Sequence, residues 1–369
     1  MTALFFFGTL QYVPVLEIVL GRAAAELDIR ADALPDHRVH AAAEGPFPMI
    51  VAAPGAAAAG IVVAGLSDAD IARLEYYEAG YDFDLVPHVT RDGTQVQVFF
   101  PQGTAWTPDG AWDLEAWVAR WGEMTEHAAR EVMGVYGRVP AAQIARWYPR
   151  IRARAWSKVL AQRGRHGEGT FQGRVEVEAH AQAYAGFFAV DEFTFRHERF
   201  DATMSEPLAR SVFLVSDAAF VLPYDPARDR VLLTEQVRTG PIIRGDRHLW
   251  QFEGIAGLID PGETPEEAVH REAMEEAGIT LDQLEPVGEC YASSGSSTDF
   301  FHMYVGLCDL PDGITGVGGA PGEGENIRSL LMPFDDLVAM AEDRRCGNLV
   351  LAHLTYWLAF HRNRLRRAG

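Results

Sequence analysis

Cysteine is scarce in this sequence, and long hydrophobic runs are missing. The 369 residues include only three cysteines, which show no CxxC or CxxH spacing: Cys290, Cys308 and Cys346. Their spacing indicates neither a zinc site nor a disulfide framework, and reduced thiols are typical of a cytoplasmic protein. No hydrophobic run reaches the ~20 residues that a membrane-spanning helix needs.

The apolar start of the chain, residues 1–21, is not typical of a signal peptide. It lacks a basic first segment, and four residues interrupt it: Gly8, Gln11, Pro14 and Glu17. We therefore interpret this segment as a buried strand, a turn and a helix.

Positive charge is also in short supply. The chain has 32 lysines and arginines against 52 aspartates and glutamates, and its formal net charge is −20. This balance argues against nucleic acid and anionic membrane surfaces as partners. It leaves a small phosphorylated ligand open, because such a ligand needs only a local cluster of metal ions and arginines. The sequence contains no internal repeat, no phosphate loop of the GxxxxGK type and no GxGxxG that fits a nucleotide-binding fold.

Length and composition predict two domains with well-packed cores, since 48% of the residues are hydrophobic and 11% are aromatic. The clearest seam is the segment 163–173, which is rich in glycine and charge and has no periodic apolar residues. We predict a strand-rich domain over 1–111, a helical extension over 112–162, a linker over 163–173 and a second domain over 174–369. Alternating strands and helices favour an α/β (α+β) class.

Two local patterns support this division. Residues 85–90 and 94–100 alternate as strands on either side of Asp92-Gly93, which predicts a hairpin. In the extension, apolar residues recur at helical spacing: Leu114, Trp117, Trp121, Met124, Ala128 and Val132. We expect this stripe to be a packing face, followed by a second helix that breaks near Pro149.

The most informative segment is GLIDPGETPEEAVHREAMEEAGI, residues 257–279. A helix turns once in 3.6 residues, so Glu272, Glu275 and Glu276 project from one face. These carboxylates repel one another unless a cation lies between them, and Mg²⁺ prefers carboxylate oxygens and bridges them to phosphates. A solvated acidic helix is the alternative interpretation. The glycines, the loop Glu263 and the Arg271-Glu272 step occur together with the carboxylates and favour the metal site.

This segment resembles the Nudix box, Gly-x5-Glu-x7-Arg-Glu-U-x-Glu-Glu-x-Gly-U, with U a bulky aliphatic residue. Every charged and glycine position matches, and the small Ala273 at the first U position is the one departure. From about Tyr184 onward the chain resembles the ADP-ribose pyrophosphatase branch, including its tellurite-resistance-associated group. The resemblance implies an α/β/α sandwich with a mixed sheet and hydrolysis of a nucleoside diphosphate linked to another group.

The resemblance also implies a set of site residues. The metal ligands would be the Ala256 carbonyl, Glu272, Glu276 and Glu325, with Glu275 completing the catalytic set. Two or three Mg²⁺ or Mn²⁺ ions would be held there. Glu323, in a glycine-rich loop, matches the general base, and Glu325 could exchange roles with it. Four residues would support the box structurally: Gly257, Glu263, Arg271 and Gly278, with Glu263 and Arg271 pairing with each other.

Substrate contacts follow from the same resemblance. Arg238 and Arg210 match positions that contact phosphate and the terminal ribose, and Phe187 matches an aromatic residue that stacks on adenine. Surface ion pairs and an ordinary core phenylalanine are the alternatives. The loop 293–299 has Ser294 and Asp299 where the family has proline and glutamate, which puts its role in substrate choice in doubt.

The first hundred residues resemble the gamma-glutamylcyclotransferase-like (AIG2-like) fold, a mixed β-barrel with helices. Gly8, Thr9 and Leu10 match a loop whose N–H groups bind a carboxylate or amide in that family. Glu78 occupies the place of a glutamate that transfers protons, a role suited to a carboxyl with a raised pKa. The alternative is a retained fold that binds a ligand, or packs on its neighbour, without catalysis.

Three functional hypotheses follow. The first is a metal-dependent pyrophosphatase that converts ADP-ribose to AMP and ribose 5-phosphate, with GDP-mannose as a sibling substrate. The second is a bifunctional enzyme whose first domain acts on γ-glutamyl compounds. The third is a nucleotide sensor without turnover, against which the three intact helix carboxylates argue. The resemblance implies a homodimer.

Overall fold

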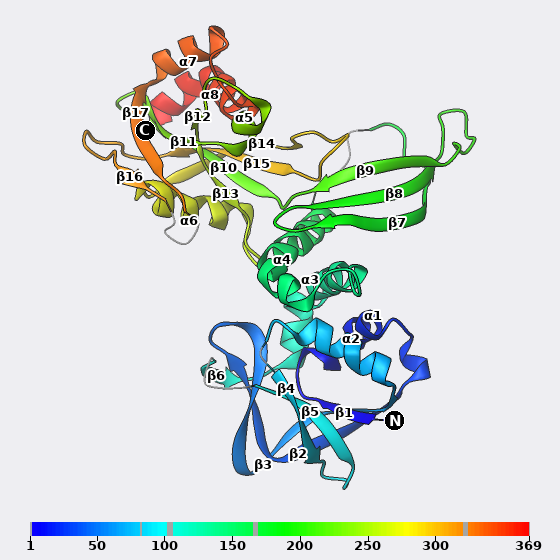
Figure 1. Ribbon diagram of the computed structural model, residues 1–369. Coiled ribbons are helices and arrows are strands. Elements are labelled where there is room, and N and C mark those ends of the chain that lie inside the picture. The colour runs from blue at the N-terminus through cyan, green and yellow to red at the C-terminus, as the bar shows by residue number, and fades with distance from the viewer. Residues whose placement is uncertain (1, 82, 102–105, 165–168, 320–323, 369) are drawn as a thin grey trace. The chain divides into compact units, whose positions relative to one another are not determined.

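The computed structural model describes residues 2–81, 83–101, 106–164, 169–319 and 324–368 (Figure 1). It divides into two compact units, Met1–Phe213 and Leu214–Gly369. The strands that follow residues 163–173 belong to the first of these units. The predicted domain boundaries stay a prediction, and each unit is described by itself.

The first unit contains a six-stranded sheet in the order β4-β5-β1-β3-β2-β6. Its strands are β1 (Thr2–Phe6), β2 (Asp28–Ala42), β3 (Gly45–Leu66), β4 (Phe83–Val89), β5 (Gln95–Pro101) and β6 (Pro108–Ala111). β1 runs parallel to β5 and antiparallel to β3. The hairpin predicted around Asp92-Gly93 is present as β4–β5, and Gly93 has the positive φ of +84° that its turn requires.

A close approach of two strands explains one glycine in this sheet. A Cβ atom at Gly60 of β3 would lie 2.4 Å from the Phe6 carbonyl oxygen and 2.5 Å from the Phe5 ring. The buried side chains around this crossing include Phe5, Phe7, Leu34, Ile50, Val62, Val96 and Val98. The predicted strand, turn and helix at the start of the chain are confirmed as β1, a 3-10 turn over Thr9–Gln11, and α1 (Val13–Leu20).

Three further helices belong to the first unit: α2 (Asp68–Glu78), α3 (Leu114–Gly134) and α4 (Ala141–Arg163). Ser67 begins α2 with a capping box, because its side chain accepts the Asp70 N–H and the Asp70 side chain accepts the Ser67 N–H. The apolar stripe of α3 is a packing face as predicted, since Trp117, Met124 and Val132 are buried.

The predicted break near Pro149 is wrong, because α4 continues through that residue. A proline inside a helix removes one backbone hydrogen bond and crowds the preceding turn. Here Pro149 lies on the exposed side, while six apolar residues of α4 are buried: Ile144, Ile151, Ala153, Ala155, Trp156 and Val159. Burial of this face on both sides of the proline stabilises the helix more than the missing bond destabilises it.

A three-stranded sheet completes the first unit: β7 (Val175–Ala185), β8 (Ala189–His197) and β9 (Leu208–Leu214). Arginines of the helical extension hold it from the side of α3 and α4. Arg138 donates a 2.9 Å hydrogen bond to the Gln182 carbonyl, and Arg154 donates one of the same length to the Phe187 carbonyl. Arg154 also forms a buried ion pair with Glu131.

The second unit is built on an eight-stranded mixed sheet. Six strands follow the order β14-β15-β10-β11-β17-β16, while β12 pairs with β11 and β13 with β10. The strands are β10 (Ala218–Asp225), β11 (Arg230–Val237), β12 (Trp250–Glu253), β13 (Ile255–Leu258), β14 (Gln283–Tyr291), β15 (Phe300–Leu307), β16 (Val317–Gly318) and β17 (Ile327–Pro333). Only the β10–β15 pairing is parallel among those recorded for this sheet within the described residues.

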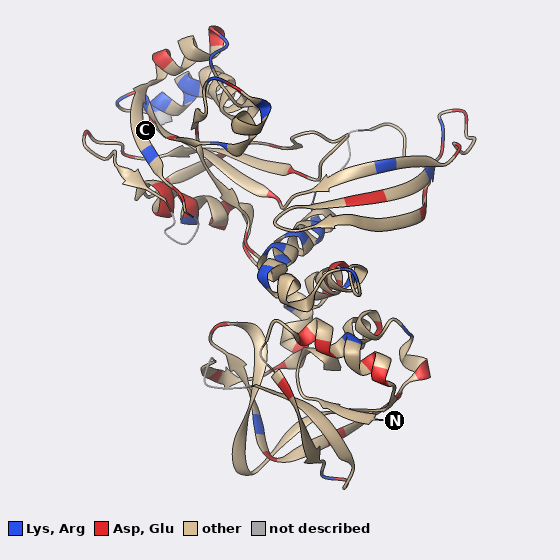
Figure 2. Ribbon diagram, viewed as in Figure 1, with Lys and Arg blue, Asp and Glu red and all other residues tan. Residues whose placement is uncertain are grey.

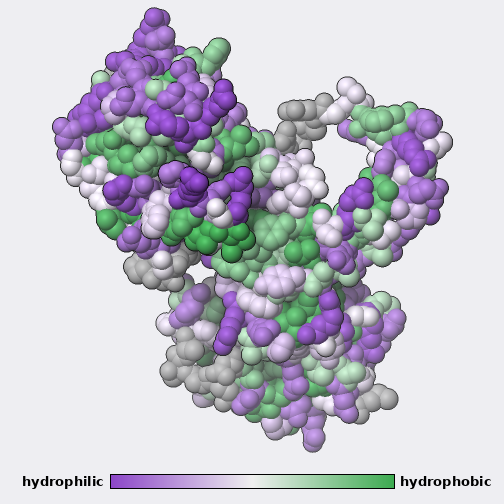
Figure 3. Space-filling model, turned by 45° about the horizontal axis from the view of Figure 1, so that its top comes forward, coloured by the Kyte–Doolittle hydropathy of each residue, from purple (hydrophilic) through white to green (hydrophobic). Residues whose placement is uncertain are grey.

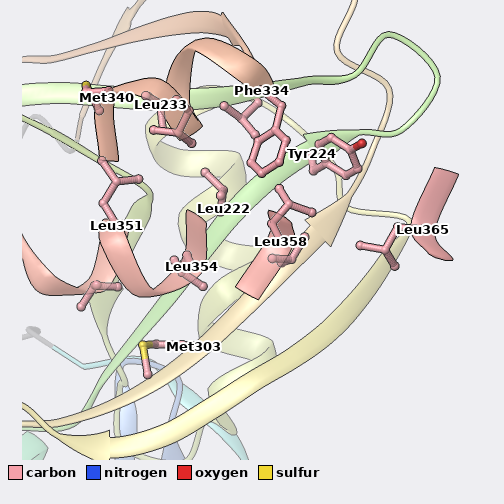
Figure 4. Close-up of a cluster of buried hydrophobic side chains, with 14 residues drawn as sticks. Leu222, Tyr224, Leu233, Met303, Phe334, Met340, Leu351, Leu354, Leu358 and Leu365 are labelled. Atoms are coloured by element: carbon pink, nitrogen blue, oxygen red, sulfur yellow. The ribbon is translucent and has the colours of Figure 1, made fainter. Parts of the chain in front are cut away.

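Helices cover both faces of this sheet. Figure 1 shows α6 (Pro265–Ala277) on one face and α7 (Phe334–Glu342) and α8 (Leu349–Ala368) on the other. β10 is buried along nearly its whole length, as expected for a strand with both faces covered. Figure 4 shows the core beneath α7 and α8, which includes Leu222, Tyr224, Leu233, Met303, Phe334, Leu351, Leu354 and Leu358. The predicted α/β/α arrangement and α/β (α+β) class are confirmed.

Hydrophilic residues cover much of the face shown in Figure 3, with hydrophobic residues exposed between them. Over the described ranges, no helix combines the length and the apolar character that crossing a membrane requires.

Candidate functional site

The acidic segment identified in the sequence forms a loop and helix α6, whose acidic residues are visible in Figure 2. The Thr264 side chain accepts the Glu267 N–H, and the Glu267 carboxylate accepts the Thr264 N–H, which is a capping box with Pro265 at the first helical position. Gly278 ends the helix at φ +64°, a left-handed conformation that glycine adopts without strain.

Arg271 holds the loop against this helix. Its Nε donates to Glu263 Oε1 at 2.8 Å, and its Nη2 donates to Glu263 Oε2 and the Leu258 carbonyl, both at 3.0 Å. Its Nη1 donates to Glu272 Oε1 at 2.5 Å and to Glu275 Oε2 at 3.3 Å. These carboxylates raise the pKa of Arg271 above its ordinary value. The predicted pair between Arg271 and Glu263 is present.

The Arg271 fork predicts a specific mutational effect. We expect Arg271→Ala to destabilise the second unit by about 2 kcal/mol, because Glu263 and Glu272 would lose their charge-assisted hydrogen bonds. The measurement is the thermal midpoint of the full chain beside Arg244→Ala, which removes an exposed arginine that pairs with Asp246. Equal losses in the two variants would contradict the bracing role.

Glu272 lies directly against the backbone of β13. A Cβ atom at Gly257 would be 1.8 Å from Glu272 Oε1 and 2.1 Å from its Cδ. No side chain therefore fits at position 257 while Glu272 keeps this position. The glycine places the carboxylate beside Ala256, whose carbonyl is a predicted metal ligand.

Glu276 is the most deeply buried carboxylate of α6, with only 5% of its surface exposed. Burial, together with the nearby Glu272 and Glu325 carboxylates, raises its pKa to about 8, whereas Arg238 opposes the shift. Within the described residues, its buried Oε2 has no hydrogen-bond partner. The three carboxylates thus form a cluster whose members repel one another.

The glycines of the following segment bring Glu325 to this cluster. A Cβ atom at Gly318 would lie 2.5 Å from the Glu276 carbonyl oxygen, and one at Gly319 would lie 2.8 Å from Glu325 Cβ. Glu325 itself is half-buried. Glu323, the residue that matches the general base, lies outside the described residues, so the choice between the two glutamates stays a prediction.

Arg238, a predicted substrate contact, forms an ion pair with Glu253 in the structure. Its Nε donates to both carboxylate oxygens, at 3.1 and 2.9 Å, and its Nη2 also donates to Glu253. The charges of Glu253, Glu276 and Glu325 raise the pKa of Arg238, although burial opposes them. Sequence reasoning missed Glu253, because only its place opposite Thr234 on the neighbouring strand brings it near Arg238.

The residues present fit a hard divalent cation. Among the described residues, no three histidine, cysteine, aspartate or glutamate side chains are already arranged to hold a metal ion. The Glu276 Oε2 nevertheless lacks a donor, and a buried carboxylate oxygen without one is costly. Oxygen ligands of this kind suit Mg²⁺ or Mn²⁺.

A cavity in the first unit brings together the other predicted residues. Gly8, Thr9, Leu10 and Glu78 all line it. Burial raises the pKa of Glu78 to about 8, so this carboxyl is largely protonated at neutral pH. The predicted loop and the predicted glutamate therefore share one site, while their catalytic role stays a prediction.

Comparison with known proteins is consistent with both sites. Residues 215–353 match the model of the NUDIX domain, and residues 4–130 match that of gamma-glutamyl cyclotransferase, AIG2-like. The ADP-ribose pyrophosphatase of Escherichia coli (strain K12) is 33% identical over 192 residues, which cover 52% of this chain and 91% of that protein. The chain belongs to the Nudix family. The resemblances to Nudix hydrolases and to the gamma-glutamylcyclotransferase-like fold are confirmed, whereas the tellurite-resistance grouping stays a prediction.

Other Nudix relatives differ in their named substrate. The GDP-mannose pyrophosphatase of Pectobacterium atrosepticum is 32% identical over 136 residues, covering 37% of this chain and 69% of that protein. A solved structure of an ADP compounds hydrolase covers 54% of this chain and all of that one, with 16% identity and a TM-score of 0.42.

The loop after the Nudix box ends at a half-buried aspartate, Asp299. Asp299 has its pKa raised to about 6 by burial and by the neighbouring Asp217. Asp217 in turn lies 3.2 Å from Nε2 of the buried His302. Thr298 fixes the loop, because its hydroxyl accepts the Val215 N–H and donates to the Val215 carbonyl. The sequence indicated Asp299 but gave no sign of Asp217 or His302.

Phe187 and Arg210 lie in the first unit, apart from the Nudix match. Phe187 is half exposed between β7 and β8, and the Arg150 guanidinium lies 4.3 Å from its ring centroid. A stacking base would have to use the other face of the ring. Arg210 is exposed and donates to the Ala209 carbonyl. Their roles toward substrate stay predictions.

Proposed function

We propose that the second unit hydrolyses the diphosphate of ADP-ribose to AMP and ribose 5-phosphate, with Mg²⁺ or Mn²⁺. The observation that carries this proposal is the buried Glu276, whose Oε2 has no donor within the described residues and which lies near Glu272 and Glu325. A relative named ADP-ribose pyrophosphatase, 91% of which is covered, supports the choice of substrate.

The cations would be held by Glu272, Glu276, Glu325 and the Ala256 carbonyl. When bound, they would neutralise the diphosphate and lower the pKa of the attacking water. Arg271 fixes the loop and the Glu272 carboxylate, so the ligands are held in place before substrate arrives. Glu275, which is half exposed, accepts a further hydrogen bond from the Arg271 guanidinium.

Arg238 would contact the phosphates. Its Nε and Nη2 are engaged by Glu253, while within the described residues its Nη1 makes no recorded hydrogen bond. The Glu253 pair orients the guanidinium, and Nη1 is the group left to donate to a phosphate oxygen. Glu323 or Glu325 would take the proton that the water releases as it attacks phosphorus.

The deciding experiment is AMP release from ADP-ribose by the full chain with Mg²⁺ or Mn²⁺. We expect turnover that EDTA abolishes and added Mg²⁺ restores, with lower kcat/KM for GDP-mannose. Glu78→Gln should keep activity within about twofold, because Glu78 lies in the first unit's cavity and would hold no metal. Binding without turnover of either substrate would overturn the enzymatic assignment and favour a sensor, and faster turnover of GDP-mannose would overturn the choice of ADP-ribose.

A further inference from the structure

The cavity of the first unit extends beyond the segment that matches the cyclotransferase model. One part is walled by aromatic residues that include Phe5, Phe7, Phe47, Phe83 and Phe99. The other part is lined by residues of α3 and α4, including Trp121, Tyr148 and Arg152. Thr9, Phe47, Glu78 and Tyr81 line both parts, so the two adjoin each other. The match ends at residue 130, and α4 therefore adds a wall outside it.

Arg152 is the charged residue that α4 contributes to this wall. It is half-buried, and within the described residues its guanidinium has no recorded hydrogen bond or ion pair. Other arginines of the basic helix α4 (Figure 2) are engaged, Arg154 by Glu131 and Arg150 by the Phe187 ring. A half-buried guanidinium without an anion has lost hydration and gained no partner.

The groups around Arg152 do not neutralise it. Glu78 lines the same cavity, but its pKa is raised by burial alone, so the Arg152 charge does not stabilise its ionised form. The hydroxyl groups of Tyr81 and Tyr148 interact by a hydrogen bond, and the charge of Arg152 acts on both. Both tyrosines line the same part of the cavity as Arg152, and their hydroxyls add hydrogen-bonding groups to it.

We propose that Arg152 is an anion-binding residue of this cavity, and that the first unit binds a small molecule with an apolar body and a single carboxylate. The phenylalanine wall would contact the apolar body, and the guanidinium would donate two parallel hydrogen bonds to the carboxylate. A phosphate dianion is a poorer fit, because Arg152 is the one arginine among the described lining residues and would balance only one of its two charges. This subsite depends on α4 and is independent of the Nudix reaction.

The test is calorimetric titration of the full chain with butyrate, hexanoate, 3-phenylpropionate and indole-3-acetate, each beside its neutral alcohol. We expect at least one acid to bind more tightly than its alcohol, and Arg152→Gln to weaken that acid by about tenfold or more. The alcohol should bind both proteins equally. Arg146→Gln is the matched control, because Arg146 is an exposed residue of the same helix that does not line the cavity.

Arg152→Lys controls for a folding defect, because it keeps the positive charge and loses only the two parallel N–H donors of the guanidinium. Its affinity should fall between wild type and Arg152→Gln. Three results would each overturn the proposal: no acid binding better than its alcohol, equal affinity in Arg152→Gln and wild type, or tighter binding of phenyl phosphate than of any carboxylate.

Discussion

Glu276→Gln is expected to lower AMP release from ADP-ribose by on the order of a thousandfold while the protein stays folded. The amide has nearly the shape of the carboxylate but cannot provide an anionic ligand. Glu276 is the buried member of the carboxylate cluster, and its Oε2 has no partner within the described residues. A structural carboxylate would be expected to have a donor there, so loss of activity without loss of folding points to a ligand role.

The same substitution should increase stability in the absence of metal. Burial and neighbouring carboxylates raise the pKa of Glu276 from 4.5 to about 8 in the folded chain. A raised carboxyl pKa means that the folded state binds the proton more tightly, so wild type loses stability as pH rises from about 4.5 to about 8. Glutamine carries no charge and escapes this loss, which amounts to a few kcal/mol above pH 8.

Both effects can be measured on one preparation. Activity is followed with Mg²⁺, and thermal midpoints are recorded in EDTA at pH 5 and pH 8.5. Glu267→Gln is the control on the same helix, because glutamine also serves at the third position of a capping box. Retained activity in Glu276→Gln would contradict the ligand assignment. So would a thermal midpoint of Glu276→Gln that lies as far below that of wild type at pH 8.5 as at pH 5.

Helix α6 and its brace were predictable because their determinants are local. Thr264 and Glu267 cap the helix, and the spacing of Glu263 to Arg271 sets the ion pair. The carboxylates share a face because of helix geometry alone. The pairing of Arg238 with Glu253 was not predictable in this way, since a strand register brings the two residues together.

Pro149 is a residue whose local signal in the sequence gave a wrong prediction. Its local effect favours a break, and the sequence does not show that apolar side chains on both sides of it would be buried in one interface. Arg152 was missed for a similar reason, because an arginine within a basic helix gives no sign of which cavity it lines. Residues whose positions depend on tertiary packing thus could not be predicted from sequence patterns. Glu323 lies outside the described residues.

Gly257→Ala is expected to reduce turnover of ADP-ribose by about a hundredfold, although the substitution adds only one methyl group. That methyl would lie 1.8 Å from Glu272 Oε1, far inside van der Waals contact. β13 is paired with β10 at this residue, through the register of Ala219 with Gly257, so the backbone is not free to retreat. The Glu272 side chain must therefore move, and its bond with Arg271 must lengthen or break.

The cost to folding should be smaller than the cost to activity, about 1–3 kcal/mol, because a side chain can yield where a strand cannot. Gly134→Ala is the matched control, since a Cβ atom there meets nothing within 4 Å. The Gly134→Ala substitution, at the end of α3, should leave turnover of ADP-ribose unchanged. The informative readout is kcat against KM: displacement of a ligand that acts in the transition state lowers kcat, whereas blocked substrate entry would raise KM alone. A Gly257→Ala enzyme with normal kcat would show that Glu272 need not lie against β13 for hydrolysis.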